Sequence, residues 1–223
     1  MRRQLAIIPV LTAMSFDELS ALAEQLDQHL NQIKPVYHKI TVEEPIPISH
    51  KFEDELTMNF AEGGLALRLG PYAEKQIGLM DHLAQIEKKK NIKRHRLYVS
   101  DRRLIRYSFG SKPEDYTFII GEGHIGKRSA MISNHSLRSK DNKEHLRLIL
   151  AMHELGHIRF MLSHCKYQFP DDKYCCMALE VAHLKRKRPH HILEYLAAKY
   201  CDKRKAEVEN FRFNPFYSPK RFL

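Results

Sequence analysis

The chain has 223 residues, of which 43% are hydrophobic and 29% charged, which is typical of a folded globular protein and excludes a disordered chain. This length suits one domain with at most a small appendage. The net charge of +10 permits binding to nucleic acid, anionic membranes or acidic proteins, but the basic residues are spread widely, so we interpret their runs as solvated surfaces and do not expect nucleic acid as a partner.

The first 42 residues have the pattern of a strand, a helix and a second strand. Residues 4–11 are mostly apolar and predict a short buried strand rather than a signal peptide, and residues 36–42 predict another. Ser15 and Glu18 form the signature of a capping box, which opens the helix between them. The apolar face of that helix consists of Leu19, Leu22, Leu26, Leu30 and Ile33. This order is typical of an α/β fold with a right-handed crossover.

The middle of the chain continues with one helix and several strands. A helix is expected from Pro71 to residue 86. The expected strands are 97–99, 117–120 and 130–132. No segment approaches the roughly 20 apolar residues of a membrane span, so no membrane partner is expected. We predict one catalytic domain at 1–204, with a mixed twisted sheet, and a surface tail at 205–223.

A loop and an edge strand are predicted near the start of the longest helix. Gly121, Gly123 and Gly126 are interpreted as a loop. Residues 130–133 are our candidate for the edge strand of the sheet, to which an extended peptide would add by backbone hydrogen bonds.

The long helix expected over residues 143–162 contains an H-E-x-x-H motif. His153 and His157 are one turn apart, so both imidazoles project from the same face and can bind one zinc ion. Glu154 stands beside the first histidine, where it can accept a proton from a zinc-activated water and pass it to the leaving amine. The motif therefore predicts a zinc metallopeptidase that hydrolyses peptide bonds, with a peptide or protein as its substrate.

A third protein ligand is expected because catalytic zinc usually has three. His164 is the nearest candidate, provided that the helix ends after His157 and the chain turns back. Glu180 is the alternative, since its distance along the chain suits a carboxylate ligand from a second helix.

All four cysteines follow the motif, and the first 164 residues have none. They are Cys165, Cys175, Cys176 and Cys201. Clustering beside histidines favours metal ligation in a reducing compartment over a disulfide framework, so we expect a cytoplasmic protein.

These motifs resemble the archaemetzincin signature, H-E-x-x-H-x-x-G-x-x-H-C, then further cysteines, a C-x-M and a C-x-x-C. Residues 153–165 are HELGHIRFMLSHC, residues 175–177 are CCM, and Cys201 follows. The segments at 118–123 and 130–133 are similar to the two strands before the family's active helix. The resemblance covers about residues 95–204 well and the N-terminal half only in outline.

The resemblance implies a single metzincin-like α/β domain with an active-site helix and a helical, zinc-stapled C-terminal part. It implies catalytic zinc on His153, His157 and His164, with Glu154 as general base and Met177 beneath the metal. A second, structural zinc would be held by cysteines. Its candidate ligands are Cys165, Cys175, Cys201 and, as an uncertain fourth, Cys176, His183, His190 or His191.

The chain departs from the signature in several respects, one of which is a longer spacing from Cys165 to Cys175. Phe160 replaces the glycine that permits a left-handed turn, and His164 comes one residue late. Arg204 stands where the C-x-x-C has its last cysteine. We expect Phe160 to remain helical and the turn to fall near residues 162–163. These departures leave one alternative function, a weakly active or inactive relative that binds a partner through its basic surface.

Overall fold

The structure is a computed structural model in which the described residues are 3–33, 37–46, 65–68, 83, 94–102, 104–107, 116–123, 128–137, 141–178 and 193–211. The helix expected from Pro71 lies outside the described residues apart from Leu83, which is buried. Glu180, His183, His190 and His191 also lie outside them. No described helix has the length and apolar character needed to cross a bilayer.

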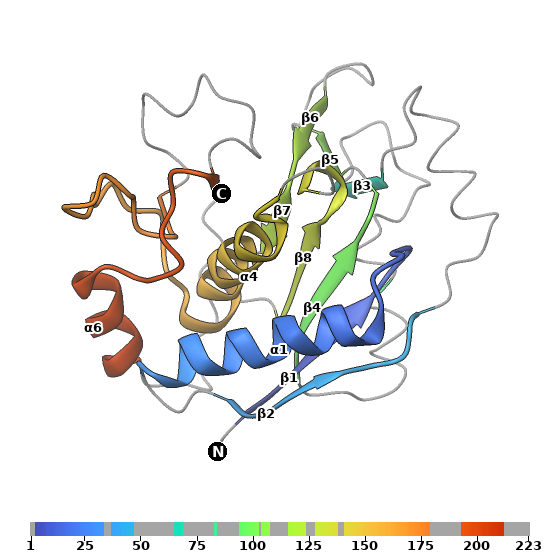
Figure 1. Ribbon diagram of the computed structural model, residues 1–223, viewed down its shortest axis with the longest axis horizontal. Helices are drawn as coiled ribbons and strands as arrows, with labels where there is room; N and C mark the ends of the chain where they lie inside the picture. Colours follow the sequence, from blue (N-terminus) through green and yellow to red (C-terminus); the bar gives the residue numbers. More distant parts are fainter. Residues whose placement is uncertain are drawn as a thin grey trace.

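The main sheet has five strands in the order β2-β1-β4-β8-β7 (Figure 1). The strands are β1 (Arg3–Pro9), β2 (Tyr37–Val42), β4 (His95–Ser100), β7 (Gly121–Gly123) and β8 (Ser129–Ser133). β1 is parallel to β2 and β4, β4 is parallel to β8, and β7 is antiparallel to β8. The mixed α/β sheet predicted from the sequence is confirmed.

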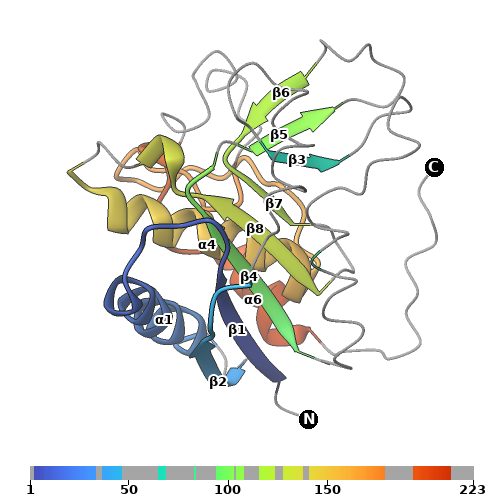
Figure 2. The same cartoon turned by 90° about the vertical axis from the view of Figure 1, so that its right-hand side faces the viewer.

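A second sheet lies beside the upper end of the first and was not expected (Figure 2). Its strands are β3 (Leu65–Arg68), β5 (Leu104–Tyr107) and β6 (Tyr116–Ile119), in the order β3-β5-β6. β6 leads through Ile120 directly into β7, so the chain passes from the small sheet to the main sheet without a loop.

Two helices pack side by side on one face of the main sheet. In α1 (Phe16–Asn31), the capping box of Ser15 and Glu18 is present, as predicted. Its buried residues are Leu19, Leu22, Ala23, Leu26 and Leu30. The second is α4 (Lys143–Phe160), which contacts α1, β4, β7 and β8. Because α4 is enclosed by these neighbours, most of its residues from 146 onward are buried.

The position of β8 corrects the predicted edge strand. β8 lies between β4 and β7, so the prediction that residues 130–133 form an edge open to a peptide is wrong. The glycine segment is not a loop in its first part, because residues 121–123 form β7, which ends the described sheet on this side. Any peptide that adds to this edge would have to pair with β7.

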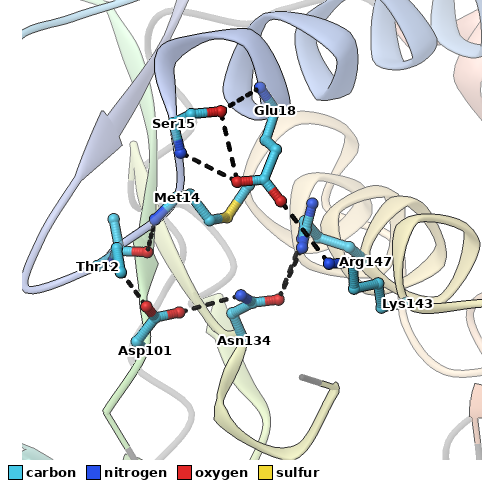
Figure 3. Close-up of polar contacts among 9 residues, drawn as sticks. Thr12, Met14, Ser15, Glu18, Asp101, Asn134, Lys143 and Arg147 are labelled. Carbon is cyan, nitrogen blue, oxygen red and sulfur yellow. Dashed lines mark hydrogen bonds and ion pairs between the residues drawn. The ribbon is translucent and has the colours of Figure 1, made fainter. Parts of the chain in front are cut away.

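A chain of buried polar side chains fastens α4 to the carboxyl ends of the parallel strands (Figure 3). Arg147 of α4 donates from Nε and Nη2 to Asn134 Oδ1, at 3.1 and 3.0 Å. Asn134 Nδ2 donates to Asp101 Oδ1 at 3.0 Å, and Asp101 Oδ2 accepts from the Ala13 backbone N–H at 2.7 Å. These residues follow β8, β4 and β1, so the network sets where α4 lies on the sheet.

The last described helix is α6 (Asp202–Asn210), which begins at Cys201 as its N-cap. A short 3-10 helix, η1 (His135–Leu137), precedes α4. α6 runs across residue 204, where the sequence analysis placed the boundary between the domain and its tail. The division into 1–204 and 205–223 stays a prediction.

Candidate metal centre

The three predicted histidines converge at the end of α4. The Nε2 atoms of His153 and His157 are 3.0 Å apart, those of His157 and His164 are 3.2 Å apart, and those of His164 and His153 are 3.3 Å apart. Nitrogens bound to one tetrahedral zinc at about 2.0–2.1 Å lie roughly 3.3 Å from each other. The three nitrogens therefore form one face of a tetrahedron of the size that zinc requires.

Backbone carbonyls fix how the two helical histidines face. His153 Nδ1 lies 2.6 Å from the Cys176 carbonyl, and His157 Nδ1 lies 2.7 Å from the Leu162 carbonyl. A carbonyl only accepts, so each Nδ1 must carry the proton, and in a neutral ring Nε2 then presents a lone pair. Two lone pairs at 3.0 Å repel each other, and a cation between them removes that repulsion. The donor set therefore suits a metal ion.

The charge state of His153 agrees with this role. Its side chain is 1% exposed, and burial, with the neighbouring His157, holds the pKa of His153 well below its usual value. The ring is therefore neutral at ordinary pH, which is the form that binds zinc.

Glu154, the predicted general base, points to β7 rather than along the helix. A Cβ at Gly121 would lie 2.5 Å from Glu154 Oε1, and a Cβ at Gly123 would lie 2.9 Å from Glu154 Oε2. The carboxylate thus occupies the space that side chains on β7 would otherwise fill, and the Glu154 side chain is 3% exposed. These two glycines keep the carboxylate between the helix and the edge of the described sheet.

Gly121→Ala is expected to lower any hydrolytic rate while metal binding is retained. The three atoms nearest to the new Cβ all belong to Glu154, so the Cβ displaces that carboxylate, and misplacing a reacting group by about 1 Å can cost on the order of 100-fold. The measurement is kcat/KM beside zinc content and melting temperature. Loss of zinc in this variant would show that Gly121 supports the ligands instead.

Met177, which the resemblance implies beneath the metal, packs against the motif helix at Gly156. A Cβ at Gly156 would lie 2.6 Å from Met177 Sδ and 3.3 Å from the Tyr200 hydroxyl, so the glycine inside HELGH lets both side chains approach the helix. Tyr200 is fully buried and donates to the Met152 carbonyl at 2.7 Å. The segment after the cysteines is therefore held directly against the helix that carries the histidines.

Three of the four cysteines form a second cluster beside the first. The sulfurs of Cys165, Cys175 and Cys201 all lie within 4.8 Å of one another, and all four cysteines are unpaired. The Cys201 backbone N–H donates to Cys175 Sγ at 3.3 Å. Cys176 is outside the group of three, and its backbone carbonyl instead accepts the hydrogen bond from His153 Nδ1.

Crowding and burial disfavour thiolates in the protein without metal. The hydrogen bond with Cys175, and then burial, raise the pKa of Cys165. For Cys175, the hydrogen bond with Cys165 lowers the pKa, but Cys176 and burial outweigh it and raise the value to about 12. A divalent cation reverses this preference, because it deprotonates the thiols that coordinate it.

Arg204 provides a separate indication that the cysteine cluster suits a metal. Its side chain is buried, and its Nε–H has no acceptor among the described atoms. The same guanidinium lies close enough to Cys165 for their hydrogen bond to lower the pKa of that thiol, against the effects that raise it. A thiolate at Cys165 would give this buried cation a strong acceptor. From the sequence alone, Arg204 is recognisable only as the residue that replaces the last cysteine of the C-x-x-C.

No protein-family model and no curated protein matches this sequence. Among solved structures, archaemetzincin from Methanopyrus kandleri is similar, with a TM-score of 0.57 and 14% identity over 93% of this chain and 94% of that chain. A zinc-dependent peptidase from Methanocorpusculum labreanum gives a TM-score of 0.52 and 14% identity, over 91% and 99%.

The chain has an archaemetzincin-like fold. At this identity the likeness establishes the fold, and the chemistry must be argued from the residues of this chain. The resemblance stated from the sequence is confirmed at the level of the fold.

The end of α4 explains how the archaemetzincin-like fold accommodates the late histidine. Phe160 remains helical, as predicted, but α4 ends at this residue and not at residue 162. The left-handed turn is at Met161, with φ 58°, and not at residues 162–163. The signature places its third histidine three residues after the glycine, and His164 is three residues after Met161. Compared with the signature, the helix of this chain extends one residue further, and the left-handed turn and the third histidine both come one residue later.

Met161→Gly is expected to stabilise the protein. A residue with a side chain in the left-handed region is strained by roughly 1–2 kcal/mol. Glycine removes this strain but loses more conformational entropy on folding, so the net gain in stability is about 1 kcal/mol. For a chain of this size we expect the melting temperature to rise by about 2–4 °C with zinc content unchanged. A lower melting temperature would mean that contacts of the Met161 side chain outweigh its backbone strain.

Proposed function

We propose that this protein is a zinc-dependent peptidase, with zinc bound by His153, His157 and His164 and with Glu154 as the general base. The observation that carries the proposal is the convergence of three histidine Nε2 atoms within 3.0–3.3 Å. The carbonyl partners at Nδ1 support it, because they direct the lone pairs of His153 and His157 to a common point.

The residues of this chain divide the chemistry between them. Zinc, when bound, polarises the scissile carbonyl and lowers the pKa of water. Glu154 accepts the proton of the attacking water and returns it to the leaving amine, since its carboxylate is held beside the helix that carries the ligands. Burial of Glu154 excludes bulk water from this proton transfer.

The substrate we propose is an extended peptide lying along β7. A peptide pairs with a strand edge through main-chain hydrogen bonds. β7 ends the described sheet, and its glycines contact the Glu154 carboxylate, so a peptide on this strand would bring its backbone close to the proposed base. The unpaired cysteines support a reducing compartment such as the cytoplasm as the place of action.

The test combines metal analysis with an assay of the full-length protein on a mixed peptide library. We expect two zinc ions per chain, hydrolysis that a chelator abolishes, and recovery on adding zinc. Zinc at the histidines without hydrolysis would favour the inactive relative considered above. A protein that binds no zinc at the histidines would overturn the proposal.

We further propose that Cys165, Cys175 and Cys201 hold the second, structural zinc. Removing it should destabilise the fold, because a structural metal contributes its binding energy to folding. Cys175→Ser is expected to lower the melting temperature by roughly 4–8 °C, which corresponds to about 2 kcal/mol for a chain of this length. Lys166→Ser, at an exposed residue next to Cys165, is the control. An unchanged melting temperature in Cys175→Ser would contradict a structural metal.

A further inference from the structure

His164 and Cys165 are neighbours in sequence but belong to different clusters. The imidazole of His164 joins the histidine group, whereas the sulfur of Cys165 joins the cysteine group. The two groups therefore share one short segment of backbone, which follows the left-handed turn at Met161. The contacts that hold this segment therefore determine the position of the His164 imidazole relative to the other two histidines.

Arg204 holds that segment from the side of the cysteines. Its Nη2 donates to the His164 carbonyl at 2.9 Å and to Ser163 Oγ at 3.1 Å. Its Nη1 donates to Glu207 Oε2, one turn further along α6. Arg204 is 6% exposed, whereas Ser163 and the Glu207 side chain are more accessible, so these bonds are partly shielded from water. Charge-assisted hydrogen bonds in such surroundings are stronger than neutral ones.

The helix that carries Arg204 starts in the cysteine cluster. Cys201 is the N-cap of α6, and its backbone N–H is bonded to Cys175 Sγ. Any change that moves or loosens Cys201 is carried by the first turn of α6 to Arg204, and from there to the His164 carbonyl. A metal at the cysteines would fix Cys165 and Cys201 together, which are the two ends of this connection.

The charge of Arg204 also suits its place. Three thiolates on one divalent zinc leave a net charge of −1, which a buried guanidinium offsets. An arginine side chain keeps its charge in proteins, and Arg204 pairs with Glu207 on the same helix. The guanidinium thus stays charged while it bonds to the backbone of the histidine segment.

We propose that Arg204 is a positioning residue that couples the two metal sites: it holds His164 in place for the histidine site from a helix anchored in the cysteine site. This inference rests on the proposed function. It predicts that metal affinity at the histidines depends on Arg204 and on occupancy of the cysteine site. Because binding free energies are reciprocal, filling the histidine site also tightens the cysteine site.

The test measures metal affinity at the histidine site in the full-length protein, with Zn²⁺ in chelator competition and with Co²⁺ as a spectroscopic probe. Thiolate-bound Co²⁺ shows sulfur-to-metal charge-transfer absorption, which histidine-bound Co²⁺ lacks, so the two sites are read separately. Arg204→Met is expected to weaken histidine-site binding by on the order of 10-fold, as for partners that orient metal ligands. Arg204→Lys, which keeps the charge and one donor, should recover part of the loss.

Lys203→Met is the matched control, since Lys203 is exposed on the same turn of α6 and should leave both sites unchanged. A double-mutant cycle then separates positioning from general damage. In a His164→Ala background, Arg204→Met should have no further effect on binding at the remaining two histidines. An equal loss in that background, or wild-type affinity in the single variant, would overturn the coupling.

If Arg204→Met also loses Co²⁺ from the cysteine site, a milder variant is used to test the histidine site. Glu207→Gln keeps the guanidinium but removes its charged partner, and it should weaken the histidine site by a few-fold with the cysteine site filled. Unchanged affinity there would overturn the inference. Failure of this inference alone leaves a zinc-loaded protein that hydrolyses peptides, whereas failure of the proposed function leaves wild-type protein with no metal at the histidines or no hydrolysis.

Discussion

Glu154→Gln is expected to abolish peptide hydrolysis while zinc binding is retained. Glutamine has the same size as glutamate, so it can occupy the space beside Gly121 without displacing β7. It cannot accept the proton of the attacking water, and losing a general base costs roughly 100- to 10,000-fold in rate. We expect kcat to fall by about 1,000-fold or more, with one zinc still bound by the three histidines.

Glu144→Gln is the matched control for this variant, because Glu144 is an exposed glutamate on the same helix. It should have wild-type turnover, zinc content and melting temperature. If Glu154→Gln retained wild-type turnover, Glu154 would not be the base and the peptidase assignment would be removed.

The parts of the fold that the sequence predicts correctly are those with local causes. The capping box of Ser15 and Glu18 and the apolar face of α1 need only the residues within that helix. The spacing of His153 and His157 similarly depends on nothing beyond helical geometry. The parallel pairing of β1 with β2 follows from a strand, a helix and a strand in close succession.

β7 could not be predicted because its residues serve a distant side chain. Glycine has low strand propensity and normally marks a turn. Gly121 and Gly123 are in a strand here because the Glu154 carboxylate, about thirty residues further along the chain, needs the space above them. Which of β7 and β8 lies at the edge depends likewise on long-range pairing. The sequence therefore predicted β8 as the edge strand, whereas β7 lies outside it.

The cysteines illustrate what spacing alone leaves open. Cys175 and Cys176 are adjacent, and the sequence offered both as ligands of one structural zinc. In the structure, Cys175 joins Cys165 and Cys201, while Cys176 is outside that group and offers its carbonyl to His153. The distinction arises from the path of the backbone between the two clusters, which no local pattern records. The contact of Arg204 with the His164 carbonyl is hidden for the same reason.

His164→Ala is expected to lower zinc affinity at the histidine site by more than about 100-fold, since removing partners that only orient a ligand already costs 10–100-fold. Two helical histidines would still define one edge of the tetrahedron, but the third nitrogen, 3.2–3.3 Å from the other two, would be lost. Zinc would then keep extra waters and dissociate more readily. The measurement is zinc retained in chelator competition with the cysteine site left filled.

Two further variants serve as controls for the effect of His164→Ala on zinc affinity. His145→Ala removes an exposed histidine of the same helix and should have no effect on zinc affinity. Glu180→Ala removes the competing ligand that the sequence offered, and zinc affinity should also be unchanged, because the three Nε2 atoms already complete a tetrahedral face without a carboxylate. If zinc were lost only in Glu180→Ala, the site would consist of two histidines and a distant carboxylate. The one-residue shift that carries Met161 and His164 together would then have no bearing on the metal.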